Sequence, residues 1–193
     1  MSIPIQPNLA HIDLSTGVIA EAVEITERHL RDMPGFFQDQ QTVRELLPND
    51  PLMYRVYLTH QGGDTNGLYT GTSVIEPGRI GREYYMTKGH FHLANTAPEV
   101  YLTLSGQGLL LMQTHSGEIA IQPMKPGAMN YIPGEWAHRT INTGEVQLVF
   151  FAVWPVSAGH DYDSIAHHGF AQLVMAGLEG PEVVANPNFT PSR

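Results

Sequence analysis

A series of short β-rich segments fills the middle of the chain, from Leu52 to Trp154, and limits the fold more than any other feature. Each segment is rich in Val, Ile, Leu, Tyr, Phe or Thr, and turns containing Gly, Pro or Ser separate many of them. Roughly eight to ten strands at this spacing predict a mainly β fold, either a two-sheet jelly roll or a small barrel. The segments cover residues 52–60, 67–75, 83–87, 99–105, 108–114, 118–124, 128–133, 138–143 and 146–154.

The two ends of the chain have different patterns. Residues 19–33 carry apolar side chains at near-helical spacing before Pro34, which predicts an amphipathic helix. A second short helix is predicted at residues 40–47, before a turn-rich segment. Beyond residue 155 we expect a loop and a short helix, and residues 183–187 are expected to add an edge strand.

The length of the chain favours a single domain, because 193 residues suffice for one well-packed core. Within this domain, residues 1–50 are expected to form a helical extension that packs on the outside of the barrel. Residues 51–155 are expected to form the barrel itself. The loop, short helix and edge strand then occupy residues 156–193.

Charge and hydropathy exclude several classes of partner. The formal net charge is −9 and Lys and Arg do not cluster, so we expect no binding to nucleic acid. The N-terminus lacks a basic region followed by an apolar run, and no segment approaches the roughly 18 apolar residues of a membrane helix. We therefore expect a cytoplasmic protein without a membrane partner. A phosphorylated ligand would have to be held by local donors, because the net charge repels anions at long range.

Four residues are candidate metal ligands. The chain has no cysteine, so any metal site must use His and carboxylate side chains. His90 and His92 are two residues apart, so in a strand both imidazoles project from one face. Glu99 follows a turn that can bring the next strand alongside, and His138 follows a turn at Pro133. An isolated histidine pair is more often only hydrogen-bonded, but this ordered set favours a divalent ion with five or six ligands.

The spacing of these residues resembles the two sequence motifs of cupins. The first motif is HisPheHis(x6)Glu(x6)Gly, which ends at Gly106, and the second runs from Gly127 through Pro133 and His138 to Asn142. Three departures mark a subfamily. They are Tyr84 and Glu135 in place of glycine, and the long gap between His92 and Glu99.

Longer stretches resemble the cupin-type phosphoglucose isomerases, which are best known from archaea. These stretches are ThrLysGlyHisPheHis at 87–92, GluValTyr at 99–101, TrpAlaHisArgThr at 136–140 and AlaGlyHisAspTyr at 158–162. The likeness covers nearly the whole chain. It implies a homodimeric jelly roll that interconverts glucose 6-phosphate and fructose 6-phosphate. It also implies one divalent ion per subunit, Fe²⁺ as the first choice and Mn²⁺, Zn²⁺ or Ni²⁺ as alternatives.

The resemblance also implies roles for individual residues. The metal ligands would be His90, His92, Glu99 and His138. The phosphate pocket would comprise Tyr54, Ser73, Thr87 and Gly89, with Ser73 in place of the threonine expected in the family. Lys88 is the one cation in the ThrLysGlyHisPheHis stretch and is included among the substrate-binding residues. Because neighbouring side chains in an extended segment point to opposite faces, Lys88 can point away from the pocket if Thr87 points into it. Tyr101, His160 and Tyr162 would face the sugar, and the catalytic set would be Glu99, His138, Tyr101 and His160.

The sequence leaves the mechanism and some alternatives open. A cis-enediol route needs a base, and Glu99 is the nearest carboxylate, but binding to a divalent ion weakens it as a base. A direct hydride shift needs the metal and no base. The competing functions are another metal cupin, acting on a different sugar phosphate or as a dioxygenase, and a sugar-binding cupin without turnover. Purely structural roles are expected for His11, His29, His60, His115, His167 and His168.

Overall fold

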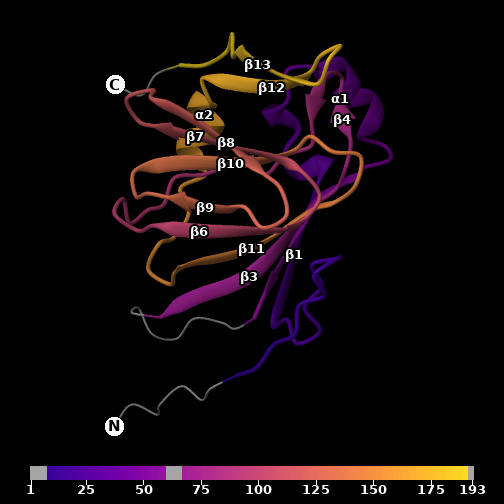
Figure 1. Ribbon diagram of the computed structural model, residues 1–193. Coiled ribbons are helices and arrows are strands. Elements are labelled where there is room, and N and C mark those ends of the chain that lie inside the picture. The colour runs from indigo at the N-terminus through magenta and orange to yellow at the C-terminus, as the bar shows by residue number, and fades with distance from the viewer. Residues whose placement is uncertain (1–7, 60–66, 191–193) are drawn as a thin grey trace.

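The computed structural model describes residues 8–59 and 67–190 (Figure 1). Its largest element is an antiparallel six-stranded sheet with the order β1-β2-β3-β11-β6-β9. These strands are β1 (Glu24–His29), β2 (Leu52–Leu58), β3 (Leu68–Ile75), β11 (Leu148–Pro155), β6 (Glu99–Ser105) and β9 (Met129–Ile132).

A second sheet of three strands faces the first, as the stacked ribbons in Figure 1 show. It consists of β10 (Trp136–Asn142), β7 (Gly108–Thr114) and β8 (Ile119–Met124). A third sheet contains β13 (Pro181–Ala185), β12 (Gln172–Ala176), β5 (Glu83–Tyr84) and β4 (Arg79–Ile80). The helices are short: the 3₁₀ turns η1 (Leu30–Asp32) and η2 (Pro34–Phe36), and the α-helices α1 (Gln40–Leu46) and α2 (Asp163–His168).

The main hydrophobic core joins the six-stranded and the three-stranded sheets. Leu110 from β7, Ile132 from β9 and Phe150 from β11 belong to one cluster and are at most 2% exposed. Burying a side chain of this size contributes about 1.5–3 kcal/mol, so the core holds both sheets in a fixed relation. The mainly β fold class predicted from the sequence is confirmed.

The helix predicted at residues 19–33 is wrong. Residues 24–29 form β1, which pairs antiparallel with β2 from Glu24 opposite Leu58 to Arg28 opposite Tyr54. Ile25 and Thr26 are β-branched, and this segment gains a full ladder of hydrogen bonds by extending the sheet, which outweighs its weak helical spacing. Of residues 19–33, only Leu30–Asp32 are helical, as η1.

Most other expected elements are confirmed. The helix predicted at 40–47 is α1, which begins where the Asp39 side chain accepts a hydrogen bond from the Thr42 N–H. The edge strand predicted at 183–187 is β13, and its partner β12 was not predicted. The strand predicted at 138–143 begins two residues earlier, at Trp136.

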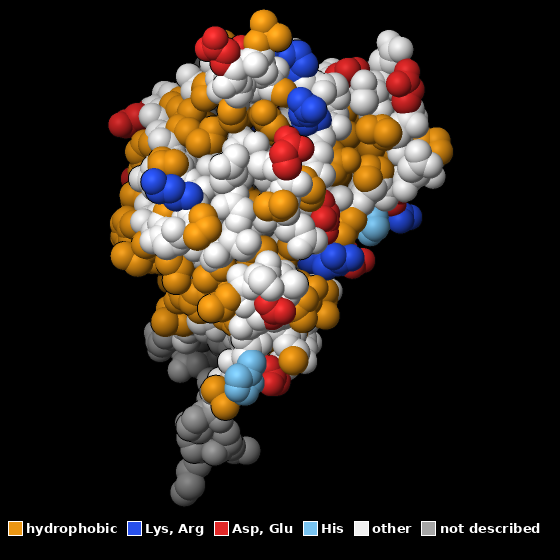
Figure 2. All heavy atoms as spheres, turned by 45° about the vertical axis from the view of Figure 1, so that its right-hand side comes forward, with side chains coloured by type: hydrophobic (Ala, Val, Ile, Leu, Met, Phe, Trp, Pro, Cys, Tyr) orange, Lys and Arg blue, Asp and Glu red, His pale blue; other side chains and the backbone are white. Residues whose placement is uncertain are grey.

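The described surface carries mixed charge. On the face shown in Figure 2, Lys and Arg side chains lie among Asp and Glu, with apolar side chains between them. Among residues 8–59 and 67–190, no helix is long and apolar enough to span a membrane.

Candidate metal centre

A pocket of about 340 Å³ lies against the inner face of the six-stranded sheet. Side chains point to alternate faces of a strand, so every second residue of a strand can face the pocket. The lining residues follow this rule: Tyr54, Val56 and Leu58 from β2, Glu99 and Tyr101 from β6, and Phe150, Ala152 and Trp154 from β11. The lining also includes Thr87, Gly89, His90, His138, His160 and Tyr162.

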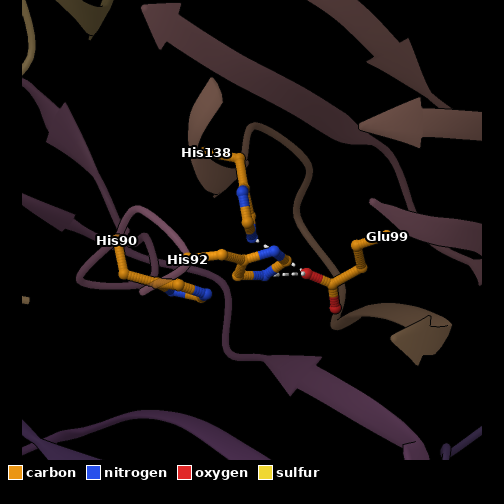
Figure 3. Close-up of side chains that lie close together, drawn as sticks. All are labelled: His90, His92, Glu99 and His138. Atoms are coloured by element: carbon orange, nitrogen blue, oxygen red, sulfur yellow. Dashed lines mark ion pairs between the residues drawn. The ribbon is translucent and has the colours of Figure 1, made fainter. Parts of the chain in front are cut away.

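The structure brings the four predicted metal ligands together at this pocket. One ligand atom from each of His90, His92, Glu99 and His138 lies within 4.8 Å of the others (Figure 3). His138 is in β10 and Glu99 begins β6, so these two ligands come from facing sheets. The segment that carries His90 is bound to β10, because the His138 N–H donates to the His90 carbonyl at 3.0 Å and the reverse bond is 3.3 Å long.

The four ligand atoms lack hydrogen bonds of their own. Glu99 Oε2 lies 3.2 Å from His92 Nε2 and 3.0 Å from His138 Nε2, but these contacts do not have hydrogen-bond geometry. Together with His90 Nε2, these three atoms make up half of the eight buried unpaired side-chain atoms in the described part of the chain. An unpaired buried polar atom costs about 1–3 kcal/mol, and a cation at their centre would satisfy all four. The residues therefore fit a metal ion.

The surroundings fix the histidines in the form that binds a metal. His92 Nδ1 lies 2.9 Å from the Ala97 carbonyl oxygen, and His138 Nδ1 lies 3.3 Å from that of Trp136. Each Nδ1–H donates to its carbonyl, so in the neutral ring the Nε2 lone pair faces the centre of the cluster. Burial lowers the pKa of His90 well below its usual value, which keeps that ring neutral.

The carboxylate of Glu99 is ionised in this environment. Burial alone would raise its pKa, but the His138 and His92 side chains beside it outweigh burial and hold the pKa below its usual value. The site thus offers three imidazole nitrogens and one carboxylate, a donor set that suits Fe, Mn, Zn, Ni or Cu.

The three residues predicted to face the sugar all line the pocket beside these ligands. The His160 ring stacks on Tyr162, with centroids 5.6 Å apart, and lies 4.5 Å from the His90 ring. Burial, aided by the Glu99 charge, raises the pKa of Tyr101 well above its usual value, so its hydroxyl stays a neutral hydrogen-bond donor.

The predicted phosphate-binding residues Tyr54, Ser73, Thr87 and Gly89 also line the pocket. Gly89 has a φ of +73°, and a Cβ there would lie 2.7 Å from the Phe170 ring and 3.0 Å from the His138 carbonyl oxygen. Only glycine fits this position without strain.

Lys88 is the one predicted substrate-binding residue that does not line the pocket. Its Nζ lies 5.9 Å from the centre of the Phe36 ring. Thr87 therefore faces the pocket and Lys88 points to the opposite side.

Sequence reasoning missed the contribution of β1. Glu24, Thr26 and Arg28 line the pocket, and Arg28 is the only Lys or Arg among the described lining residues. Because a helix was predicted for this segment, these residues were not expected to share the pocket-facing side of a strand. The signal that could have found them is the position of Glu24, Thr26 and Arg28 at every second residue, which places them on one face of a strand.

Three other histidines lie outside the pocket lining and make local contacts. His11 pairs with Glu21, His29 Nδ1 lies 2.9 Å from the Asp50 carbonyl oxygen, and the His115 ring stacks on Phe91. His60 and the side chains of His167 and His168 lie outside the described residues.

Comparisons with solved structures find partial likeness. Oxalate decarboxylase from Bacillus subtilis aligns with a TM-score of 0.44 at 19% identity, over 56% of this chain and 26% of that one. A cupin 2 conserved barrel domain protein from Salinispora arenicola aligns with a TM-score of 0.40 at 19% identity, over 54% of this chain and 77% of that one.

Comparisons of sequence are far closer. A family model for glucose-6-phosphate isomerase matches residues 27–188. The glucose-6-phosphate isomerase of Pyrococcus horikoshii is 42% identical over 185 residues, which cover 95% of this chain and 97% of the relative. That of Thermococcus gammatolerans is 45% identical over 179 residues, which cover 93% and 94%. The chain therefore belongs to the glucose-6-phosphate isomerase family.

Proposed function

We propose that this protein is a metal-dependent isomerase that interconverts glucose 6-phosphate and fructose 6-phosphate. The observation that carries the proposal is the pocket itself: four unpaired ligand atoms converge at its wall, and hydroxyl, amide and guanidinium donors share the same lining. The names of the relatives supply the substrate. Cytoplasmic location and the absence of nucleic-acid and membrane partners remain predictions.

The phosphate group is held by donors on the loop before His90 and on the sheet. Tyr54, Ser73 and Thr87 offer hydroxyls, and Gly89 offers its backbone N–H. Burial raises the pKa of Tyr54, so this hydroxyl also stays protonated. Arg28 adds the positive charge that a dianion needs inside a protein with a net charge of −9.

The four ligands would hold one divalent ion, which we propose to be Fe²⁺, with Mn²⁺, Zn²⁺ or Ni²⁺ as alternatives. When bound, such an ion polarises the oxygens on C1 and C2 of the open-chain sugar. Tyr101 and His160 lie beside the ligands and orient the sugar chain.

Glu99 moves the proton between the two carbons in the cis-enediol route. One oxygen of its carboxylate faces the histidines and the other points away from them (Figure 3). The second oxygen can therefore take the proton from C2 of glucose 6-phosphate and return it to C1, while the hydroxyl proton on O2 passes to O1. A hydride shift between the carbons would leave Glu99 as a ligand only.

The test is a coupled assay of fructose 6-phosphate conversion by the metal-loaded protein, with and without exhaustive chelation. We expect activity that disappears with the metal and returns when the ion is restored. Full activity after chelation contradicts the metal mechanism. Binding of fructose 6-phosphate without conversion would identify a sugar-binding protein, and metal-dependent oxygen consumption would identify a dioxygenase.

We also propose a homodimer that forms through the open edge of β1. Within the described residues β1 is the last strand on its side of the sheet, and Val23 and Ile25 are 50% and 56% exposed there. Unpaired backbone groups of an edge strand favour association with a second copy. A mass in solution of twice 21.3 kDa is expected by light scattering. Ile25→Lys should shift the protein toward monomer, whereas Leu178→Lys, at another exposed apolar site, should not. A dimer unchanged by Ile25→Lys contradicts this interface.

A further inference from the structure

Arg139 is a buried cation behind the wall of the pocket, outside its lining. Its residue is 4% exposed, and its guanidinium lies 5.7 Å from the ring centre of Phe36 and 4.5 Å from that of Phe170. Burial lowers its pKa to about 10, which still leaves it charged at neutral pH. A buried charge is expensive to keep, and the function proposed above gives this one no role.

The guanidinium is bound to one peptide group. Arg139 Nε and Nη2 both donate to the Lys88 carbonyl oxygen, at 3.2 Å and 2.7 Å. No peptide bond in the described chain is cis, and in a trans peptide the C=O and the next N–H point in opposite directions. Because the Lys88 oxygen points toward Arg139, the Gly89 N–H points away from it.

The far side of this peptide group is the pocket, which Gly89 lines. No atom of residues 8–59 or 67–190 accepts a hydrogen bond from the Gly89 N–H. A positive charge at a carbonyl oxygen withdraws electrons from the amide and strengthens its N–H as a donor, since linked hydrogen bonds polarise one another. The Arg139 charge therefore strengthens a hydrogen-bond donor in the pocket, although its own side chain does not line the pocket.

We propose that Arg139 is a positioning residue that orients and polarises the Lys88–Gly89 peptide, so that the Gly89 N–H binds the phosphate group of the substrate. The inference rests on the proposed function for the identity of the anion. It differs from the role of Arg28, whose side chain lines the pocket directly.

The test uses calorimetric titration of the full-length, metal-loaded protein with inorganic phosphate. Arg139→Met, which keeps apolar contact with the two rings, should weaken phosphate binding about tenfold, the usual loss for one charge-assisted hydrogen bond. The KM for fructose 6-phosphate should rise by a similar factor while kcat and metal content stay near wild type. Arg44→Met, on the exposed face of α1, is the matched control and should change none of these.

Phosphate affinity within about twofold of wild type in folded Arg139→Met overturns the proposal, by the scale of a single hydrogen bond. Loss of metal or of kcat with unchanged phosphate affinity also overturns it, because Arg139 would then support the position of the neighbouring metal ligand His138. If Arg139→Met does not fold, Arg139→Lys decides, since lysine keeps the charge but loses the two-point hold. Wild-type affinity in Arg139→Lys overturns the proposal. Titration with phosphate needs no turnover, so a protein that binds phosphate without isomerising fructose 6-phosphate contradicts the proposed function alone.

Discussion

Glu99 combines two roles at the scale of a single residue, because one carboxylate oxygen faces His92 and His138 while the other is turned away. Binding and proton transfer can then use different oxygens. The carboxylate is also ionised, as a base requires, because its two histidine neighbours lower its pKa.

Glu99→Gln tests this division. We expect kcat for fructose 6-phosphate to fall about 100-fold or more, because the amide cannot accept the proton, while KM changes little. The three histidines should still hold the ion. Steady-state kinetics and metal analysis of the same sample check both expectations. Near-normal turnover with the metal retained would instead favour the hydride shift.

Arg28 and Lys88 form a matched pair, because Arg28 lines the pocket and Lys88 does not. Arg28→Gln should raise the KM for fructose 6-phosphate about tenfold with little change in kcat, since the lost contact is to the non-reacting phosphate. Lys88→Gln should leave KM nearly unchanged. Kinetics on the two variants side by side check the assignment. A raised KM in Lys88→Gln and an unchanged KM in Arg28→Gln would instead assign the phosphate contact to Lys88, which the sequence included among the substrate-binding residues.

At the scale of the element, β1 shows which features a local sequence pattern cannot predict. The ligands His90, His92, Glu99 and His138 could be predicted because their spacing is local and typical of one kind of site. The contribution of Arg28 could not, because it depends on β1 pairing with β2, a partner some 25 residues away along the chain. The strand β12 was missed for a similar reason, since its partners β13 and β5 are set by the packed fold.

The end of β1 is held by His29, and this contact predicts a dependence on pH. The Asp50 carbonyl oxygen raises the pKa of His29, against the opposing effect of burial. A raised pKa stabilises the fold below the unfolded value of about 6.5, and this contribution is lost as the pH rises through the folded value. His29→Gln should therefore lower the Tm more at about pH 5.5 than at about pH 8. Thermal unfolding at the two values checks this. An equal loss at both would contradict the charged contact.

At the scale of the whole molecule, the metal site joins the six-stranded and the three-stranded sheets. Glu99 comes from the six-stranded sheet and His138 from the three-stranded sheet, so an ion bound to both acts as a cross-link. A ligand that binds only the folded state stabilises it by mass action.

Removal of the metal should therefore lower the Tm of the full-length protein. At about 1,000 times the Kd, binding contributes about 4 kcal/mol, which corresponds to a shift of about 10 °C for a chain of this size. Calorimetry before and after chelation measures the shift, and restoring the ion should reverse it. An unchanged Tm after verified loss of the metal would show that the sheets do not depend on the ion.

The close fit around Gly89 predicts which residue relatives of this protein carry at the same position. Any side chain there would meet the Phe170 ring and the His138 carbonyl oxygen, so the loop would have to move away from β10. A relative with alanine at this position would have to shift this loop, and with it the metal ligand His90, away from His138.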